Sequence, residues 1–287
     1  MLGFLLAVSL WGPSAHSKML ECQSHISETK ASCSFRVCLM DATESYGRPS
    51  LVFYPLKAPP YLPIRVHLHG WTQESLGEPR NEDYDFPWPD AGKTPSLDET
   101  AKFWSAYGLH RATCAGNPEI LIVPLSRGHN DDHLTYLTSP EKFASYYMEI
   151  ATGLSGMVPD SNEVHLSVHS GGGKILAQIL DPDDSSIKRI KIFDGIYDAA
   201  TSTRLNKWLA RTHASRRELE VYSVTQATYL YSNAVTFNGV KSRDPVQPVA
   251  WTRNPTTSLR FEWVLDGSID HYTIVPSRFA DQGWNEE

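Results

Sequence analysis

The residues best suited to do chemistry lie in the segment 166–173, which reads Leu-Ser-Val-His-Ser-Gly-Gly-Gly. Ser170 stands between an apolar stretch typical of a buried strand and a helix-like stretch, and three glycines follow it. A serine at such a turn projects its hydroxyl above the edge of a sheet, where it can act as a nucleophile. The N–H of Gly171 would lie at a helix N-terminus and could bind a developing oxyanion. A glycine-rich turn that binds phosphate is the alternative, although the P-loop spacing is absent.

A serine hydroxyl is a weak nucleophile unless a nearby base takes its proton. The sequence contains eleven histidines, of which His213 and His271 follow Ser170. His213 lies in a stretch of charged, surface-type residues, whereas His271 comes just after the last apolar segment and before a final helix-like segment. We therefore expect His271 to be the general base. The alternative is a histidine that only satisfies polar groups of its own loop.

A third group must orient the imidazole and stabilise its cation. We favour Asp194, because it ends an apolar segment and a strand end would give its carboxylate a fixed position. Asp198, four residues later, and Asp244, in an irregular stretch farther along, remain candidates. Asp266 and Asp270 are close in sequence to the proposed base, and we interpret both as residues that shape its loop.

Short apolar segments alternate with longer helix-like segments along the chain, which predicts alternating strands and helices. The first two strands, joined by a polar turn, are expected to form an antiparallel pair. The alternation indicates an α/β fold: a mostly parallel twisted sheet of about eight strands with helices on both faces. The predicted strands are 34–40, 51–54, 64–69, 119–124, 164–168, 190–193, 219–224 and 259–265, and the predicted helices are 97–112, 140–154, 174–180, 203–210 and one starting near 276.

A serine between a strand and a helix in such an alternation resembles the α/β-hydrolase superfamily, the fold of many lipases, esterases and peptidases. The G-x-S-x-G motif of that family appears here as residues 168–172, with Val168 in place of the usual first glycine. The resemblance extends over about residues 34–280. It implies a serine hydrolase that cleaves an ester or amide bond through an acyl-enzyme on Ser170, with no cofactor.

The same resemblance bears on two further positions. His69-Gly70 followed by Trp71 is similar to the family's His-Gly motif after its third strand, which implies that the N–H of Trp71 joins that of Gly171 in an oxyanion hole. The commoner family position for the acid would point to Asp244, whereas the position used by some lipases points to Asp194.

Two other classes of function compete with a serine hydrolase. A metal-dependent hydrolase could draw its ligands from two histidine-containing segments. In a strand, His67 and His69 would point to the same face, but the compact H-x-H-x-D-H arrangement of binuclear zinc hydrolases is missing. The second segment supplies His129, Asp131 and His133. A non-catalytic carbohydrate- or protein-binding module is the other class, because eight tryptophans and thirteen tyrosines could form a stacking platform.

Charge argues against a nucleic-acid partner. The formal net charge is -7, from 26 basic and 33 acidic residues, whereas nucleic-acid binding requires a basic face. We expect a small-molecule or peptide substrate and no stable insertion into a membrane.

The beginning of the chain predicts export. Residues 1–17 read as a signal peptide, because an apolar stretch too short to span a bilayer is followed by a small-x-small cleavage pattern. The remaining residues, 18–287, are expected to form a single domain that is secreted or periplasmic. Four cysteines fit such a location, and we expect at least one disulfide among Cys22, Cys33 and Cys38.

Overall fold

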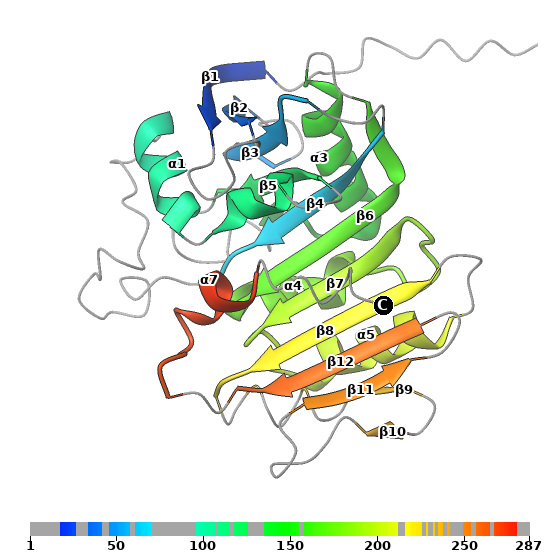
Figure 1. The fold of residues 1–287 in the computed structure, drawn as a ribbon. Helices are drawn as coiled ribbons and strands as arrows, with labels where there is room; N and C mark the ends of the chain where they lie inside the picture. The colour runs from blue at the N-terminus through cyan, green and yellow to red at the C-terminus, as the bar shows by residue number, and fades with distance from the viewer. Residues whose placement is uncertain are drawn as a thin grey trace, which may run out of the picture.

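The architecture is a single ten-stranded sheet with helices packed against it (Figure 1). The strands lie in the order β1-β2-β3-β5-β4-β6-β7-β8-β12-β11 across the sheet. The computed structural model describes residues 18–26, 34–41, 46–57, 61–70, 96–106, 108–114, 118–125, 135–154, 158–211, 216–225, 228, 232, 235–237, 240–241, 249–253, 257–264 and 267–279. The signal peptide predicted for residues 1–17 lies outside this described part.

Six adjacent strands, from β5 through β4, β6, β7 and β8 to β12, run parallel to one another. Antiparallel strands complete the sheet on both sides. The strands are β1 (Lys18–Ile26), β2 (Ser34–Asp41), β3 (Pro49–Pro55), β4 (Leu62–Leu68), β5 (Ile120–Pro124), β6 (Pro159–His169), β7 (Ile187–Phe193), β8 (Arg217–Ser223), β11 (Val249–Arg253) and β12 (Thr257–Trp263). The short strands β9 (Thr236–Phe237) and β10 (Val240–Lys241) form a separate antiparallel pair.

The predicted α/β class and mostly parallel sheet are confirmed, and β2 and β3 form the expected antiparallel pair. The expected number of about eight strands was too low, because β1 and β11 were not foreseen. Both are outermost strands of the sheet, and neither has the near-continuous apolar sequence of a strand buried on both faces.

The two faces of the sheet pack against different helices (Figure 1). Alternate residues of the central strands, such as Ile64, Val66 and Leu68, join apolar residues of α3, α4 and α5 in one cluster. A second cluster on the other face contains residues of α1 and α7. The helices are α1 (Leu97–Ala106), α3 (Pro140–Thr152), α4 (Gly173–Ile179), α5 (Ala199–Ala210) and α7 (Ile274–Arg278), with 3-10 turns η2 (Leu109–Cys114) and η3 (Ser170–Gly172).

Buried charged side chains pair with one another across neighbouring strands. Arg65 donates two hydrogen bonds to Glu119, one of them at 2.9 Å, and the Nδ1 atom of His165 lies 2.6 Å from the same carboxylate. Burial would raise the pKa of Glu119, but the charges and hydrogen bonds of Arg65 and His165 hold it well below its usual range. Because a buried charge without a partner is costly, removal of any one member of this group would destabilise the fold.

A disulfide joins Cys22 to Cys38, which confirms the expected bridge within the cysteine cluster. The two residues lie directly opposite each other on β1 and β2, and their Cα atoms are 4.1 Å apart. Cys33 lies outside the described residues. In the part of the chain that the structure describes, no helix has the length and apolar character needed to cross a membrane.

Candidate active site

Ser170 lies at the corner between the end of β6 and the start of α4, in the turn η3. Its backbone adopts a φ angle of 51°, in the left-handed region that residues with a side chain rarely occupy. Among the described non-glycine residues, Asp194 is the other one with a positive φ angle, at 47°. Backbone strain of this kind collects at functional sites, and a strained strand-to-helix turn is the setting of a nucleophile elbow.

The imidazole of His271 connects Ser170 to Asp194. Its Nε2 atom lies 2.8 Å from the hydroxyl oxygen of Ser170, and its Nδ1 atom lies 2.6 Å from a carboxylate oxygen of Asp194. An ionised carboxylate only accepts hydrogen bonds, so Nδ1–H donates to Asp194. In the neutral ring, Nε2 then carries no hydrogen and accepts from the Ser170 hydroxyl. This tautomer is the one needed to take a proton from the serine.

The Asp194 carboxylate is completely buried and satisfied by several donors. One oxygen accepts from the N–H groups of Val224, at 2.9 Å, and Thr225, at 3.1 Å, and from the hydroxyl of Thr228. Burial raises the pKa of Asp194, but the hydrogen bond and charge of His271, together with these donors, lower it to about 2. The carboxylate is therefore ionised at neutral pH.

Of the other aspartates considered from the sequence, two accept hydrogen bonds from backbone N–H groups and two lie outside the described residues. Asp198 caps the N-terminus of α5 by accepting from the N–H of Thr201 at 2.7 Å. Asp270 accepts from the N–H groups of Tyr272 and Thr273, which shapes the turn around His271 as expected. Asp244 and Asp266 lie outside the described residues.

No family model and no curated protein sequence matches this chain. Among solved structures, the glucuronoyl esterase from Solibacter usitatus superposes with a TM-score of 0.52 and 10% sequence identity, over 95% of this chain and 87% of that chain. The chain has the α/β-hydrolase fold.

Two further solved structures match over smaller parts. Esterase B from Lactobacillus Rhamnosis gives a TM-score of 0.37 at 10% identity, over 65% of this chain and 64% of that chain. The match therefore spans less than two thirds of esterase B. The rice cell wall degrading esterase LipA from Xanthomonas oryzae gives a TM-score of 0.37 at 17% identity, over 68% of this chain and 54% of that chain.

Within the α/β-hydrolase fold, glycines allow three loops to close around Ser170. A Cβ atom added to Gly173, at the start of α4, would lie 1.6 Å from the carbonyl oxygen of Gly195, in the loop after β7. A Cβ atom on Gly70, after β4, would lie 2.3 Å from the Cβ atom of Ser170. Val168, which departs from the family motif, is instead fully buried in the apolar cluster beneath α3, α4 and α5.

One of the two expected oxyanion donors lies in the described part. Gly171 follows Ser170 in the turn η3 and is buried. The loop after β4 begins beside its amide, because a Cβ atom on Gly70 would lie 2.9 Å from the Gly171 nitrogen. Trp71, the expected second donor, lies outside the described residues.

Sequence reasoning missed several residues that lie around Ser170, Asp194 and His271. Burial and the nearby charge of Asp194 raise the pKa of Tyr197 to about 12, and the Ser170 side chain opposes this shift. Thr225 and Thr228 hold the Asp194 carboxylate, and His169 contacts the backbone of His271. Tyr197 follows Asp194 by three residues, and this proximity was the available signal. The threonines and His169 meet their partners only through the fold.

The histidines considered as metal ligands are placed as follows. The rings of His67 and His69 both contact Trp104, so the two side chains share a face of the sheet as expected. Burial holds the pKa of His67 well below its usual value, and its Nδ1 atom lies 2.9 Å from the hydroxyl of Ser167. Among the described residues, no group of three or more His, Cys, Asp or Glu side chains could hold a metal ion. The segment with His129, Asp131 and His133 lies outside the described part.

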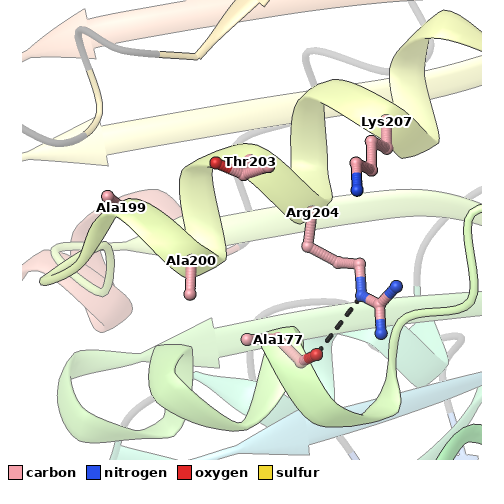
Figure 2. Close-up of a pocket in the computed structure, with 6 residues that line it drawn as sticks. All are labelled: Ala177, Ala199, Ala200, Thr203, Arg204 and Lys207. Atoms are coloured by element: carbon pink, nitrogen blue, oxygen red, sulfur yellow. Dashed lines mark hydrogen bonds between the residues drawn. The ribbon is translucent and has the colours of Figure 1, made fainter.

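A cavity of about 400 Å³ lies between α4 and α5, on the side of the sheet that these helices cover (Figure 2). Arg204 crosses it and donates to the carbonyl oxygen of Ala177 at 3.3 Å. The remaining lining residues are Ala199, Ala200, Thr203 and Lys207. None of the three residues linked through the imidazole lines this cavity, so we do not assign it to the chemistry of Ser170.

The substitution Gly173→Ala should disturb the site through the backbone. The new methyl group would overlap the Gly195 carbonyl, so either α4 or the loop that carries Asp194 has to move. Overpacking of this kind costs about 1–3 kcal/mol, and we expect the free energy of unfolding in urea to fall by that amount. Gly267→Ala is the matched control, because its added Cβ atom meets nothing within 4 Å. Equal stability of the two variants would contradict the close approach.

Proposed function

We propose that this chain is a serine hydrolase that cleaves an ester or amide bond through an acyl-enzyme on Ser170. One observation carries the proposal: a single imidazole lies within hydrogen-bond distance of both a serine at a strained strand-to-helix corner and a buried carboxylate. An ester is the first substrate to test, since the chain shares its fold with a glucuronoyl esterase.

In the first half of the reaction, Ser170 Oγ attacks the substrate carbonyl carbon while His271 Nε2 takes the hydroxyl proton. The carbonyl oxygen becomes an oxyanion, which the amide of Gly171 and, as we propose, that of Trp71 stabilise by about 3 kcal/mol each. Asp194 holds the imidazolium in place. His271 then gives the proton to the leaving group, the bond to that group breaks, and the acyl group remains on Ser170.

In the second half, water hydrolyses the acyl-enzyme, and His271 again acts first as base and then as acid. His271 takes a proton from the water as its oxygen attacks the acyl carbon, and the same amides hold the second oxyanion. The bond between Ser170 and the acyl group then breaks, and His271 returns the proton to the serine oxygen. The products are a carboxylic acid and the alcohol or amine released earlier, and the triad is restored.

Labelling with a fluorophosphonate probe tests the nucleophile and the base. We expect the wild-type protein to be labelled at Ser170, and Ser170→Ala to abolish labelling. Both Ser170→Ala and His271→Ala should lower turnover of an ester by about 10⁶-fold, because either change removes the proton transfer on which attack depends. Circular dichroism should show that the variants remain folded.

Two outcomes would contradict a serine nucleophile. Turnover that survives in Ser170→Ala, and that disappears after exhaustive chelation of metals, would favour a metal-dependent hydrolase. Absence of both labelling and turnover in the wild-type protein would favour a binding module.

Exchanging the acid should identify it. Asp194→Asn removes the negative charge that fixes the His271 tautomer, and we expect turnover to fall by about 10⁴-fold. Asp198→Asn is the control, because asparagine also caps a helix and should preserve activity. A larger loss in Asp244→Asn than in Asp194→Asn would overturn the assignment.

Because the pKa of Asp194 is about 2, its contribution to the free energy of unfolding is present above pH 4 and is lost as the pH falls through 2.

We also propose that the protein is exported, with residues 1–17 removed as a signal peptide. The Cys22–Cys38 disulfide supports this proposal, since such bonds persist mainly in oxidising compartments. Expression in a secreting host should yield, outside the cell, a protein with the mass of residues 18–287 that gains two hydrogens on reduction of this bridge. A full-length, unprocessed chain retained in the cytoplasm with both thiols free would contradict export.

A further inference from the structure

His169, the residue directly before Ser170, reaches back to the loop of His271. Its Nε2 atom lies 2.7 Å from the main-chain carbonyl oxygen of His271, although 102 positions separate the two residues in the sequence. The two imidazole rings lie against each other, with centroids 4.9 Å apart and planes inclined by 35°. His169 is buried, with an exposed fraction of 7%.

The partner of His169 determines its protonation. A carbonyl oxygen only accepts hydrogen bonds, so the Nε2 atom of His169 carries the hydrogen and donates it. Burial and the nearby charge of His271 lower the pKa of His169 to about 3, even though the bond to the carbonyl opposes this shift. The ring is therefore neutral at neutral pH. His169 therefore adds no positive charge beside His271 when, in the proposed reaction, that residue takes the serine proton.

The Asp270 side chain holds the turn around His271 internally, but its hydrogen bonds do not join that turn to β6. The turn before His271 faces the solvent, with Gly267, Ser268 and Asp270 exposed. The hydrogen bonds to Asp194 and Ser170 hold only the two ring nitrogens. A bond to the carbonyl fixes the main chain from which the ring projects, and it comes from the last residue of β6, which pairs with Phe193 of β7.

We propose that His169 is a positioning residue, whose Nε2–H donates to the His271 carbonyl and sets the distance between His271 and Ser170. Because His169 and Ser170 are adjacent, one dipeptide then holds the base at its main chain and at its Nε2 atom. His169 acts through His271 rather than on the substrate, so the inference rests on the proposed serine-hydrolase function. The alternative is that His169 only fills space beside the ring.

Two variants of similar length separate donation from packing. In His169→Gln, the amide nitrogen lies the same number of bonds from Cβ as the imidazole Nε2 atom and can donate. In His169→Met, an apolar chain of the same length cannot. The readout is saturation kinetics of a fluorophosphonate probe, which give the maximal rate of inactivation, kinact, and the half-saturating concentration, KI, without knowledge of the natural substrate.

We expect His169→Met to lower kinact by about 10- to 100-fold with KI unchanged, since a base misplaced by about 1 Å costs a factor of this size. His169→Gln should stay within about threefold of wild type. The final labelled fraction should be complete in both, because irreversibly unfolded protein would lower that fraction, and reversible unfolding would raise KI and leave kinact unchanged.

The outcomes distinguish this inference from the function on which it rests. Wild-type labelling at Ser170 with equal kinact in the wild type and in His169→Met would overturn the role of His169 alone. Equal losses in the Met and Gln variants would assign His169 to packing. If His169→Met does not fold, His169→Asn takes its place, because its amide is one bond too short to reach the carbonyl. No labelling of the wild type would overturn both proposals.

Discussion

The site depends on hydrogen bonds to one carboxylate that water cannot reach. Asp194 is fully buried and ionised, so every lone pair that it directs into the protein needs a donor. Those donors come from the loop after β8, through Val224, Thr225 and Thr228, and from the loop after β12, through His271. The need to neutralise this charge therefore draws three chain segments to one point above the sheet. The tautomer of His271, and with it the direction of the proposed proton transfer, follows from the same hydrogen bond.

The parallel sheet makes that convergence possible. The strands β6, β7, β8 and β12 are neighbours and run in one direction, so their carboxyl ends meet at one edge of the sheet. Ser170 and Asp194 directly follow β6 and β7, and both have left-handed backbones that turn the chain sharply out of the strand. Glycines at 173 and 195 let the two turns touch. The packing and hydrogen bonds of the regular sheet offset the free-energy cost of backbone strain at these two corners.

The sequence was most informative where the chemistry is local. The corner that carries Ser170 and the strand end that carries Asp194 are each defined by residues that are adjacent in the sequence. Both could therefore be proposed without coordinates. His271 could be proposed because few histidines follow Ser170. Strands β1 and β11 escaped notice, since an outermost strand need not be continuously apolar. The contact of His169 with His271 spans 102 positions, and no spacing rule connects residues so far apart. Trp71 and Asp244 lie outside the described residues, so their predicted roles remain predictions.

The disulfide lies a long way from this chemistry. Cys22 and Cys38 fasten β1 to β2 at one margin of the sheet, and β3, β5 and β4 stand between that margin and β6. Opening the bridge would remove one cross-link between β1 and β2, which stay paired through their backbones, and the strands that end at Ser170 and Asp194 would keep their neighbours. A reducing environment is therefore expected to lower the stability of this margin of the sheet before it disturbs the arrangement of Ser170, Asp194 and His271.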